Sequence, residues 1–392
     1  MKRQVQLAAL TVAAAAVLAA CGKKEEPAKK AEAAPPPPVA VIKIGHVAPL
    51  TGGIAHLGKD NENGARLAVE EINAAGGIKI GDKTFNVELV AEDDKADPKE
   101  GTVAAQKLVD AGVAAVVGHL NSGTSIPASK IYADANVTQI SPSATNPKLT
   151  EQGFKTTFRV VANDNQQGAV LANYAAEALK AKTIAIVDDR TAYGQGLADV
   201  VERVAKEKGL KVVAREFTND KATDFNAILT KIRGTKPDVI MYGGMDATAG
   251  PMAKQMKQLG IKSVLLAGDG VCSPEFIKLA GDAAGVLHCS MAGEAVEKLA
   301  RGAEFVDKYK KRFNADVQVY SPYSYDAVYV ITDAIKRAGN ADRAAITGAM
   351  PATNYPGVTG TIAFDDKGDI KGGAISMFQV KGDKLEYVST VR

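Results

Sequence analysis

Two stretches rich in hydroxyl and amide side chains follow short apolar runs in the first half of the chain. Residues 118–124 read GHLNSGT, and residues 141–147 read SPSATNP. Each stretch lies near the start of a helix-like pattern, and the free N–H groups of a helix N-terminus suit an anion. Neither stretch has a Lys or Arg at its core, which favours a carboxylate over a phosphate. Alternatively, Ser122, Thr124 and Thr145 are only helix caps, which are common.

A third stretch places a carboxylate between two glycines, in Gly268-Asp269-Gly270. An ionised Asp only accepts hydrogen bonds, so Asp269 is suited to an ammonium group; alternatively it is a turn residue. An anion site and a cation acceptor together are complementary to a zwitterion. Tyr193 and Met245 would then line an apolar side chain of the ligand, unless they simply pack in a core.

Alternating strand-like and helix-like segments position these stretches. Continuous apolar runs indicate buried strands, and apolar residues at helical spacing indicate the helices between them. This alternation predicts an α/β fold with two doubly wound parallel sheets. In open sheets of this class, ligands bind outside the carboxyl ends of the strands. The predicted strands that end at candidate loops are 113–117, 137–140, 183–187, 239–242 and 264–267.

The order of elements changes near residue 295. Two helical stretches, 295–313 and 322–338, precede a strand-rich tail at 360–390. We expect this tail to add strands to both sheets, so that the chain crosses between two domains more than once.

Motifs of common catalytic and cofactor sites are missing. The sequence holds no P-loop, no His-Glu-x-x-His and no Gly-x-Ser-x-Gly, and its Gly-x-Gly runs lack the third glycine of a dinucleotide fingerprint. We therefore expect no enzyme activity, no cofactor and no metal site. The four histidines show no ligand spacing; they are His46, His56, His119 and His288.

The net charge of the chain is concentrated near its start. The protein has 392 residues, and 48 Lys and Arg against 45 Asp and Glu give a net charge of +3. The first 40 residues carry this excess, so the neutral remainder gives no electrostatic reason to bind nucleic acid or anionic lipid. A hydrophobic content of 46% excludes a disordered chain.

Residues 1–20 have the layout of a secretory signal peptide, with a basic start, a short Ala-rich apolar run and small residues at the end. The four residues LAAC that end at Cys21 resemble the lipobox of bacterial lipoproteins, in which the cysteine is lipidated. The alternative is an ordinary signal that ends near a Cys. Residues 21–40 then provide the lipidated Cys and a charged, Pro-rich tether. We expect this lipid anchor to be the protein's only link to a membrane.

If Cys21 carries lipid, Cys272 and Cys289 remain as one possible disulfide. Disulfides persist in exported proteins, and closing this short loop would stabilise the fold by about 3 kcal/mol on the chain-entropy model. The alternative is two buried free thiols.

Several segments of residues 41–392 occur in the order and spacing of a known family. The matching segments include 44–53, INAAGGI at 72–78, 93–98, 117–119, SPSATNP at 141–147 and YGQG at 193–196. With them, the sequence resembles the periplasmic branched-chain amino acid binding proteins, the leucine/isoleucine/valine-type receptors of ABC transporters. The resemblance implies a type I periplasmic binding protein, in which two lobes joined by a three-stranded hinge close over an amino acid.

The resemblance also implies roles for individual residues. Ser122, Ser143, Ala144 and Thr145 fall where the family grips the ligand carboxylate, and Asp269 falls where it commonly has a Glu for the ammonium. Ser143 replaces a usual Ala, but the contact there is made by the backbone.

Other positions correspond to the side-chain pocket of that family. Tyr193 and Tyr320 fall on aromatic walls, whereas Leu57 and Met245 stand where leucine-type receptors often place Tyr. These two departures reshape the pocket, so the identity of the ligand stays open among branched-chain, aromatic and related amino acids.

From these features we expect an N-terminal lobe of residues 41–161 plus about 295–368, and a C-terminal lobe of 162–294 plus about 369–392. The expected function is high-affinity binding of an aliphatic or related amino acid and its delivery to an ABC permease. We expect a monomer that is lipid-anchored in the periplasm or at the cell surface. The alternatives are a ligand-sensing receptor subunit of the same fold and, with less support, an exported α/β hydrolase.

Overall fold

The computed structural model describes residues 40–392, so the predicted signal peptide, Cys21 and residues 22–39 of the tether lie outside the described residues. The first sheet consists of β1 (Ala40–Ala48), β2 (Ile78–Ile80), β3 (Lys83–Asp93), β4 (Ala115–Gly118), β5 (Thr138–Ser141) and β6 (Thr157–Arg159). Their order across the sheet is β2-β3-β1-β4-β5-β6, and only the β2–β3 pair is antiparallel.

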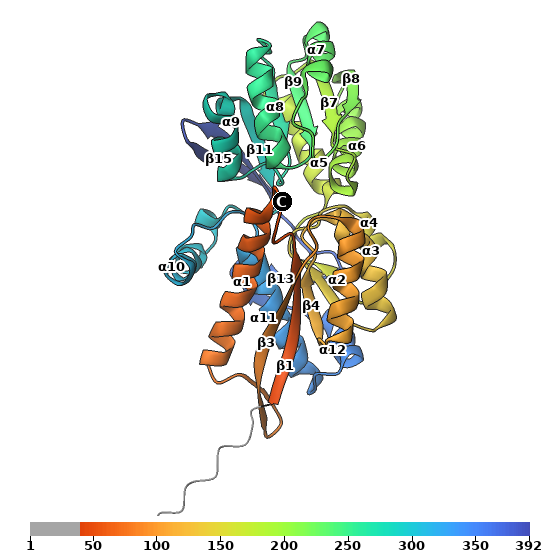
Figure 1. Ribbon diagram of the computed structural model, residues 1–392, viewed down its shortest axis with the longest axis vertical. Helices are drawn as coiled ribbons and strands as arrows, with labels where there is room; N and C mark the ends of the chain where they lie inside the picture. Colours follow the sequence, from red (N-terminus) through yellow and green to blue (C-terminus); the bar gives the residue numbers. More distant parts are fainter. Residues whose placement is uncertain (1–39) are drawn as a thin grey trace, which may run out of the picture. The chain divides into compact units, whose positions relative to one another are not determined.

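Helices cover this first sheet, and they connect its parallel strands (Figure 1). The helices are α1 (Ala55–Ala74), α2 (Pro98–Asp110), α3 (Ser122–Asp134) and the short α4 (Lys148–Glu151). Helix α2 begins where the sequence indicates, because the Asp97 carboxylate accepts the N–H groups of Lys99 and Glu100 and Pro98 needs no N–H partner.

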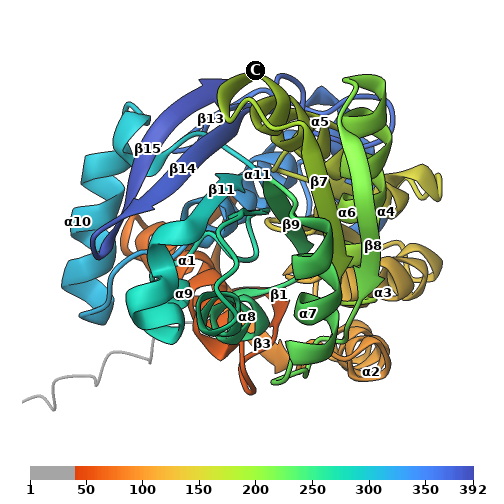
Figure 2. The same cartoon turned by 90° about the horizontal axis from the view of Figure 1, so that it is seen from above.

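The second sheet has seven strands. They are β7 (Thr183–Asp188), β8 (Lys211–Phe217), β9 (Val239–Gly243), β10 (Val264–Ala267), β11 (Leu287–Met291), β14 (Ile375–Lys381) and β15 (Lys384–Val391). The order is β15-β14-β11-β10-β9-β7-β8, with β14 and β15 antiparallel at one edge (Figure 2). The connecting helices are α5 (Asp164–Asn173, continued by a π-helical turn), α6 (Ala192–Glu207), α7 (Asn226–Thr235), α8 (Asp246–Gln258) and α9 (Pro274–Ala280).

Between β11 and β14 the chain returns to the first sheet. Helix α11 (Ser321–Ala338) packs along α1, and α12 (Arg343–Ala349) contacts β5, whereas α10 (Gly302–Phe313) follows a short 3-10 turn. Strands β12 (Tyr355–Gly357) and β13 (Gly360–Ile362) form a separate two-stranded ribbon.

The expectation that the tail extends both sheets is wrong, because β14 and β15 both join the second sheet. A turn interrupts the tail, in which the Asp365 carboxylate accepts the N–H groups of Lys367, Gly368 and Asp369. Before this turn the tail forms only β13, which pairs with β12 in the separate ribbon, and after it come β14 and β15. The expected α/β fold with two doubly wound sheets is confirmed, with antiparallel strands at the edges.

The chain passes between the two groups of elements at residues 160–163, 292–301 and 363–374. Most of the buried side chains of both sheets belong to one large core and a second core beside β9 and β10. Within residues 40–392, none of the helices is both long and apolar enough to span a bilayer.

Candidate functional site

The carboxyl ends of strands from both sheets meet around one narrow cavity. The space between its walls is small, with a volume of about 10 Å³, which is about the space of one water molecule. The residues that line it are Leu120, Asn121, Ser122, Ser143, Tyr193, Met245, Asp269 and Tyr320. Six of the nine residues expected to bind the ligand therefore lie together, although they span almost 200 positions of the sequence.

Three expected residues do not line this cavity. Leu57 is fully buried inside α1. Ala144 is buried, and its backbone N–H already donates to Ser141 Oγ at 2.9 Å. Thr145 is buried beside the cavity with a hydroxyl that has no hydrogen-bond partner within the described residues.

The hydroxyl side of the cavity is built at the start of α3 and in the loop after β5. Ser122 Oγ accepts the backbone N–H of Asn146 at 3.1 Å, which leaves the Ser122 proton for another acceptor. Ser143 Oγ donates to Leu120 O at 3.1 Å and accepts from Asn61 Nδ2 at 3.3 Å. The Ser143 hydroxyl is thus occupied within the protein, whereas the Ser122 hydroxyl can donate into the cavity.

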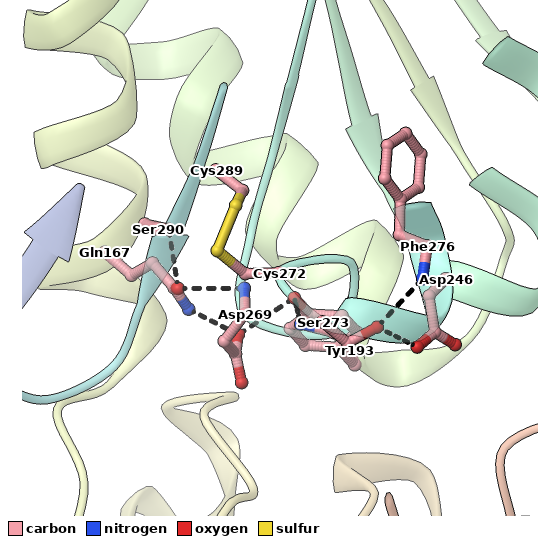
Figure 3. Close-up of a disulfide and its surroundings, with 10 residues drawn as sticks. Gln167, Tyr193, Asp246, Asp269, Cys272, Ser273, Phe276, Cys289 and Ser290 are labelled. Atoms are coloured by element: carbon pink, nitrogen blue, oxygen red, sulfur yellow. Dashed lines mark hydrogen bonds between the residues drawn. A yellow bond between two sulfur atoms is a disulfide. The ribbon is translucent and has the colours of Figure 1, made fainter. Parts of the chain in front are cut away.

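The other side of the cavity carries the buried carboxylate of Asp269. Asp269 Oδ1 accepts from Gln167 Nε2 and from the Tyr193 hydroxyl, both at 2.9 Å (Figure 3). Asp269 Oδ2 accepts from the Tyr320 hydroxyl at 2.7 Å. Tyr193 in turn accepts the N–H of Gly270 at 3.2 Å, so its own proton is directed at Asp269. Burial raises the pKa of Asp269, although these three hydrogen bonds oppose the shift.

Two glycines allow Tyr193 and Met245 to pack closely against the loop that carries Asp269. A Cβ on Gly268 would lie 2.5 Å from the Tyr193 hydroxyl oxygen, and a Cβ on Gly270 would lie 2.6 Å from Met245 Sδ. Any larger residue would force the tyrosine or the methionine away from the cavity. The Gly-Asp-Gly pattern in the sequence is therefore explained by packing against the cavity wall.

Sequence reasoning missed a second carboxylate at the site, Asp164, the first residue of α5. It is completely buried, and its N–H donates to Thr145 O at 2.8 Å. Its Oδ2 makes no hydrogen bond of regular geometry within the described residues, although the Thr145 hydroxyl lies close enough to oppose the rise of its pKa. Burial and the charge of Asp269 raise the pKa of Asp164 to about 7. Gln167, also missed, lies between the two carboxylates and donates to Asp164 Oδ1 at 3.4 Å.

Two buried charged residues hold the cavity wall from behind. The Asp60 carboxylate accepts the N–H groups of Val319, Tyr320 and Ser321 at 2.7 to 3.0 Å, and this places Tyr320 at the start of α11. Arg159, fully buried at the end of β6, anchors the 141–147 loop by donating to its backbone carbonyl groups.

The Arg159 guanidinium donates to Ala144 O at 2.8 Å and to Asn146 O at 3.0 Å. Its Nε donates to Asp369 Oδ1 at 2.5 Å, and Asp369 belongs to one of the segments that connect the two sheets. The hydroxyl-rich loop is thus linked to the segment that would bend if the lobes moved.

Besides the hydrogen bond from Asp164 to Thr145, three side-chain contacts join the first group of elements to the second. Tyr320 binds Asp269 as described, and Asn146 Nδ2 donates to Ala192 O at 2.6 Å. His56 Nε2 lies 2.7 Å from Asp246 Oδ2, so the N-terminal ends of α1 and α8 are connected directly. Burial alone would lower the pKa of His56, but the hydrogen bond and charge of Asp246 outweigh it and raise the pKa.

Comparison with known proteins agrees with this architecture. The sequence model of a family described as periplasmic binding protein matches residues 41–384. The chain belongs to the periplasmic binding protein family. This periplasmic binding protein is 38% identical over 334 residues to the Leu/Ile/Val-binding protein homolog 1 of Brucella abortus, which covers 85% of this chain and 88% of that protein. It is 35% identical over 338 residues to a leucine-, isoleucine-, valine-, threonine- and alanine-binding protein of Pseudomonas aeruginosa, over 86% of this chain and 89% of that one.

Solved structures of other periplasmic binding proteins superpose on the chain. A leucine binding protein from Thermotoga maritima has a TM-score of 0.83 at 30% identity and covers 89% of this chain and 98% of its own. A branched-chain amino acid transporter substrate-binding protein from Streptococcus pneumoniae, in complex with isoleucine, has a TM-score of 0.81 at 31% identity and covers 90% of this chain and 99% of its own. The type I periplasmic binding protein fold with two lobes is thereby established.

Proposed function

We propose that this protein binds an aliphatic amino acid, with leucine, isoleucine and valine as the first candidates, and delivers it to an ABC permease. The observation that carries the proposal is the arrangement of charge in the cavity. A hydroxyl with a free proton lies on one side, and a buried carboxylate lies on the other. A zwitterionic amino acid has the complementary charges, and the names of the relatives in Brucella and Pseudomonas support the same class of ligand.

The ligand ammonium would lie between Asp269 and Asp164. An ammonium group donates three hydrogen bonds, and the unpartnered Oδ2 atom of Asp164 offers an acceptor beside the one on Asp269. Two buried carboxylates close together are unfavourable when both are ionised, and a bound cation removes that penalty. The hydroxyls of Ser122 and Thr145 would then receive the ligand carboxylate.

The apolar part of the cavity is suited to a branched aliphatic side chain. Leu120, Met245 and the ring of Tyr320 line it, and none of them carries a charge. A methionine adapts its shape readily, so Met245 would allow several aliphatic side chains of similar size.

Binding would act by shifting the protein between an open and a closed form rather than by catalysis. The contacts of Tyr320, Asn146 and His56 with the second lobe exist only when the lobes are together, so a ligand that also bridges the lobes favours the closed form. The lobe boundaries implied by this motion are 41–161 with about 295–368, and 162–294 with about 369–392.

We also propose that the protein is a monomer tethered to a membrane by lipid on Cys21, in the periplasm or at the cell surface. The lipobox-like residues before Cys21 and the Pro-rich stretch up to residue 40 support this location. Cys21→Ser should release the protein into the soluble fraction, while ligand binding by residues 41–392 stays unchanged. If the Cys21→Ser variant is still found in the membrane fraction, the lipid anchor is contradicted.

The binding function is tested by calorimetry on protein that has been unfolded, freed of co-purified ligand and refolded. We expect leucine, isoleucine or valine to bind, and 4-methylpentanoate, which is leucine without its amino group, to bind at least about 10²-fold more weakly. Mass spectrometry of the ligand released on unfolding identifies the natural ligand. Equal binding of leucine and 4-methylpentanoate, or binding of neither by a folded protein, would reject the proposed site.

A further inference from the structure

A disulfide closes a very small ring around Asp269. Cys272 and Cys289 are bonded, with their Cα atoms 5.4 Å apart (Figure 3). In the sheet, Cys289 of β11 is also the direct neighbour of Ala267, the last residue of β10. Cys289 of β11 therefore holds both ends of the loop 268–271. It pairs with Ala267 before the loop and is bonded through sulfur to Cys272 after it.

The ring restrains the backbone of Asp269, and the next residue of β11 restrains its side chain. The N–H of Cys272 donates to Asp269 O at 3.1 Å. Ser290 Oγ donates to Gln167 Oε1 at 2.8 Å, and Gln167 Nε2 donates to Asp269 Oδ1. Cys289 and Ser290 thus connect the acceptor to the sheet by two separate routes.

We propose that the Cys272–Cys289 disulfide is a positioning element of the amino acid site, which holds Asp269 where the ligand ammonium is bound. This inference rests on the proposed function and adds to it a role for two residues that do not touch the ligand. Both sulfurs belong to fully buried residues, and neither cysteine lines the cavity.

The same ring also holds a contact outside the cavity. Ser273, directly after Cys272, donates through Oγ to Asp246 Oδ2, the oxygen that faces His56 of the other lobe. The Ser273 hydroxyl further accepts the N–H of Phe276 at the start of α9. Release of the loop would thus loosen both the ammonium acceptor and one contact between the lobes.

The test compares the double variant Cys272→Ala/Cys289→Ala with the wild-type protein. We expect the affinity for leucine to fall by about tenfold or more, since a misplacement of about 1 Å in a positioned group can cost about 10²-fold. The affinity for 4-methylpentanoate should change much less, because that molecule has no ammonium. The preference for the amino acid over its deaminated analogue therefore shrinks, and this ratio is the readout that a loss of stability alone would not move.

A matched control and a second background make the test decisive. Ile232→Ala shortens a fully buried side chain of α7 in the same core as Cys272, so it lowers the melting temperature without touching the loop. We expect Ile232→Ala to leave the preference ratio unchanged. In an Asp269→Asn background, loss of the disulfide should cause little further loss of leucine affinity, because the group that it positions has already been removed.

Each outcome separates the two proposals. If wild-type protein binds leucine and the disulfide-free variant keeps the full preference for leucine over 4-methylpentanoate, the positioning role is rejected while the proposed function stands. The positioning role is also rejected if removal of the disulfide lowers leucine affinity by the same factor in the Asp269→Asn background as in the wild-type protein. If the double Ala variant does not fold, Cys272→Ala/Cys289→Val, which fills part of the vacated volume, is measured in its place. Failure of the wild-type protein to bind any amino acid would reject the proposed function and this inference with it.

Discussion

The two walls of the cavity use different chemistry. The wall from the first lobe offers neutral hydroxyls: Ser122 lines the cavity with a proton free to donate, and Thr145 is buried beside the cavity. The wall from the second lobe offers the carboxylate of Asp269, and Asp164 is buried behind it; both are hydrogen-bonded to the protein. Loss of one neutral hydrogen-bond donor costs little binding free energy. A buried charge that loses its partner costs more, because water cannot reach it to compensate. We therefore expect substitutions in the second wall to weaken binding more than those in the first.

Asp269→Asn is expected to have the largest effect. The substitution keeps the shape of the side chain and removes its charge, which leaves the ligand ammonium under-compensated inside a closed cavity. Loss of one partner of a buried charge pair costs about 3–5 kcal/mol, so we expect affinity for leucine to fall by roughly 10²–10³-fold or more. Calorimetry with leucine measures this loss. A variant that binds leucine at full strength would remove Asp269 from the site.

Thr145→Ala is expected to have a smaller effect. It removes one neutral donor from a carboxylate that keeps its other partners, at a cost on the order of 1.5–3 kcal/mol. Thr145→Ser, which retains the hydroxyl, is the matched control and should bind nearly as well as the wild-type protein. A loss in Thr145→Ala equal to that in Asp269→Asn would contradict the difference between the two walls.

The raised pKa of Asp164 makes leucine binding depend on pH. In the ligand-free protein this pKa is about 7, so the group is largely protonated at pH 6. A bound ammonium favours the carboxylate, and binding therefore releases a proton and strengthens as the pH rises toward 8. The expected change in the dissociation constant between pH 6 and pH 8 is about tenfold.

Titration calorimetry in buffers of different ionisation enthalpy detects this proton release. Burial also raises the pKa of Asp269, so that group contributes in the same direction. Asp164→Asn should flatten most of the profile between pH 6 and pH 8. An unchanged profile in Asp164→Asn would show that Asp164 does not face the ligand.

The contact between His56 and Asp246 should give the smallest effect, and its sign is opposite. Asp246 raises the pKa of His56 in the closed form, while Glu275 acts in the same direction and Lys278 against it. Protonated His56 thus stabilises the closed form below its raised pKa, and this contribution is lost as the pH rises through that value. Because His56 is partly exposed, we expect no more than a few-fold change in affinity.

The His56→Gln variant isolates this contribution. It keeps a hydrogen-bonding side chain near Asp246 but cannot gain a proton, so the difference between its pH profile and that of the wild-type protein belongs to His56. Affinity of the variant should rise more steeply with pH than that of the wild-type protein. Parallel profiles would exclude a role for this contact in closure.

The sequence predicted those parts of the site that depend on local patterns. Strand ends, glycines and hydroxyl-rich loops are local features, and they were sufficient to place Ser122 and Asp269 at strand ends before the structure was known. Asp164, Gln167 and Arg159 were missed because their placement depends on contacts that are distant in sequence. Asp164 and Gln167 look like ordinary polar residues of a first helical turn, and only the crossing of the chain after β6 buries them beside Asp269.

Leu57 is a residue that was expected to line the cavity and does not. Its position suggested a cavity wall, but its side chain is fully buried in the large apolar core and does not line the cavity. Which residues of a helix face a partner depends on how that helix packs, and this is settled by contacts distant in sequence. The long tail was misjudged similarly, because its strand-like pattern does not show which sheet β14 and β15 join, and their pairing with β11 lies far away in sequence.

The position of Ala40 has a consequence for how the protein would be presented to a transporter. Strand β1 begins at Ala40 (Figure 1). The cavity lies at the carboxyl ends of the strands, beyond Ala48. Nine residues of extended chain span about 30 Å. Any attachment through the residues before Ala40 therefore joins the first lobe at the amino end of β1, and the cavity lies at the opposite end of that strand.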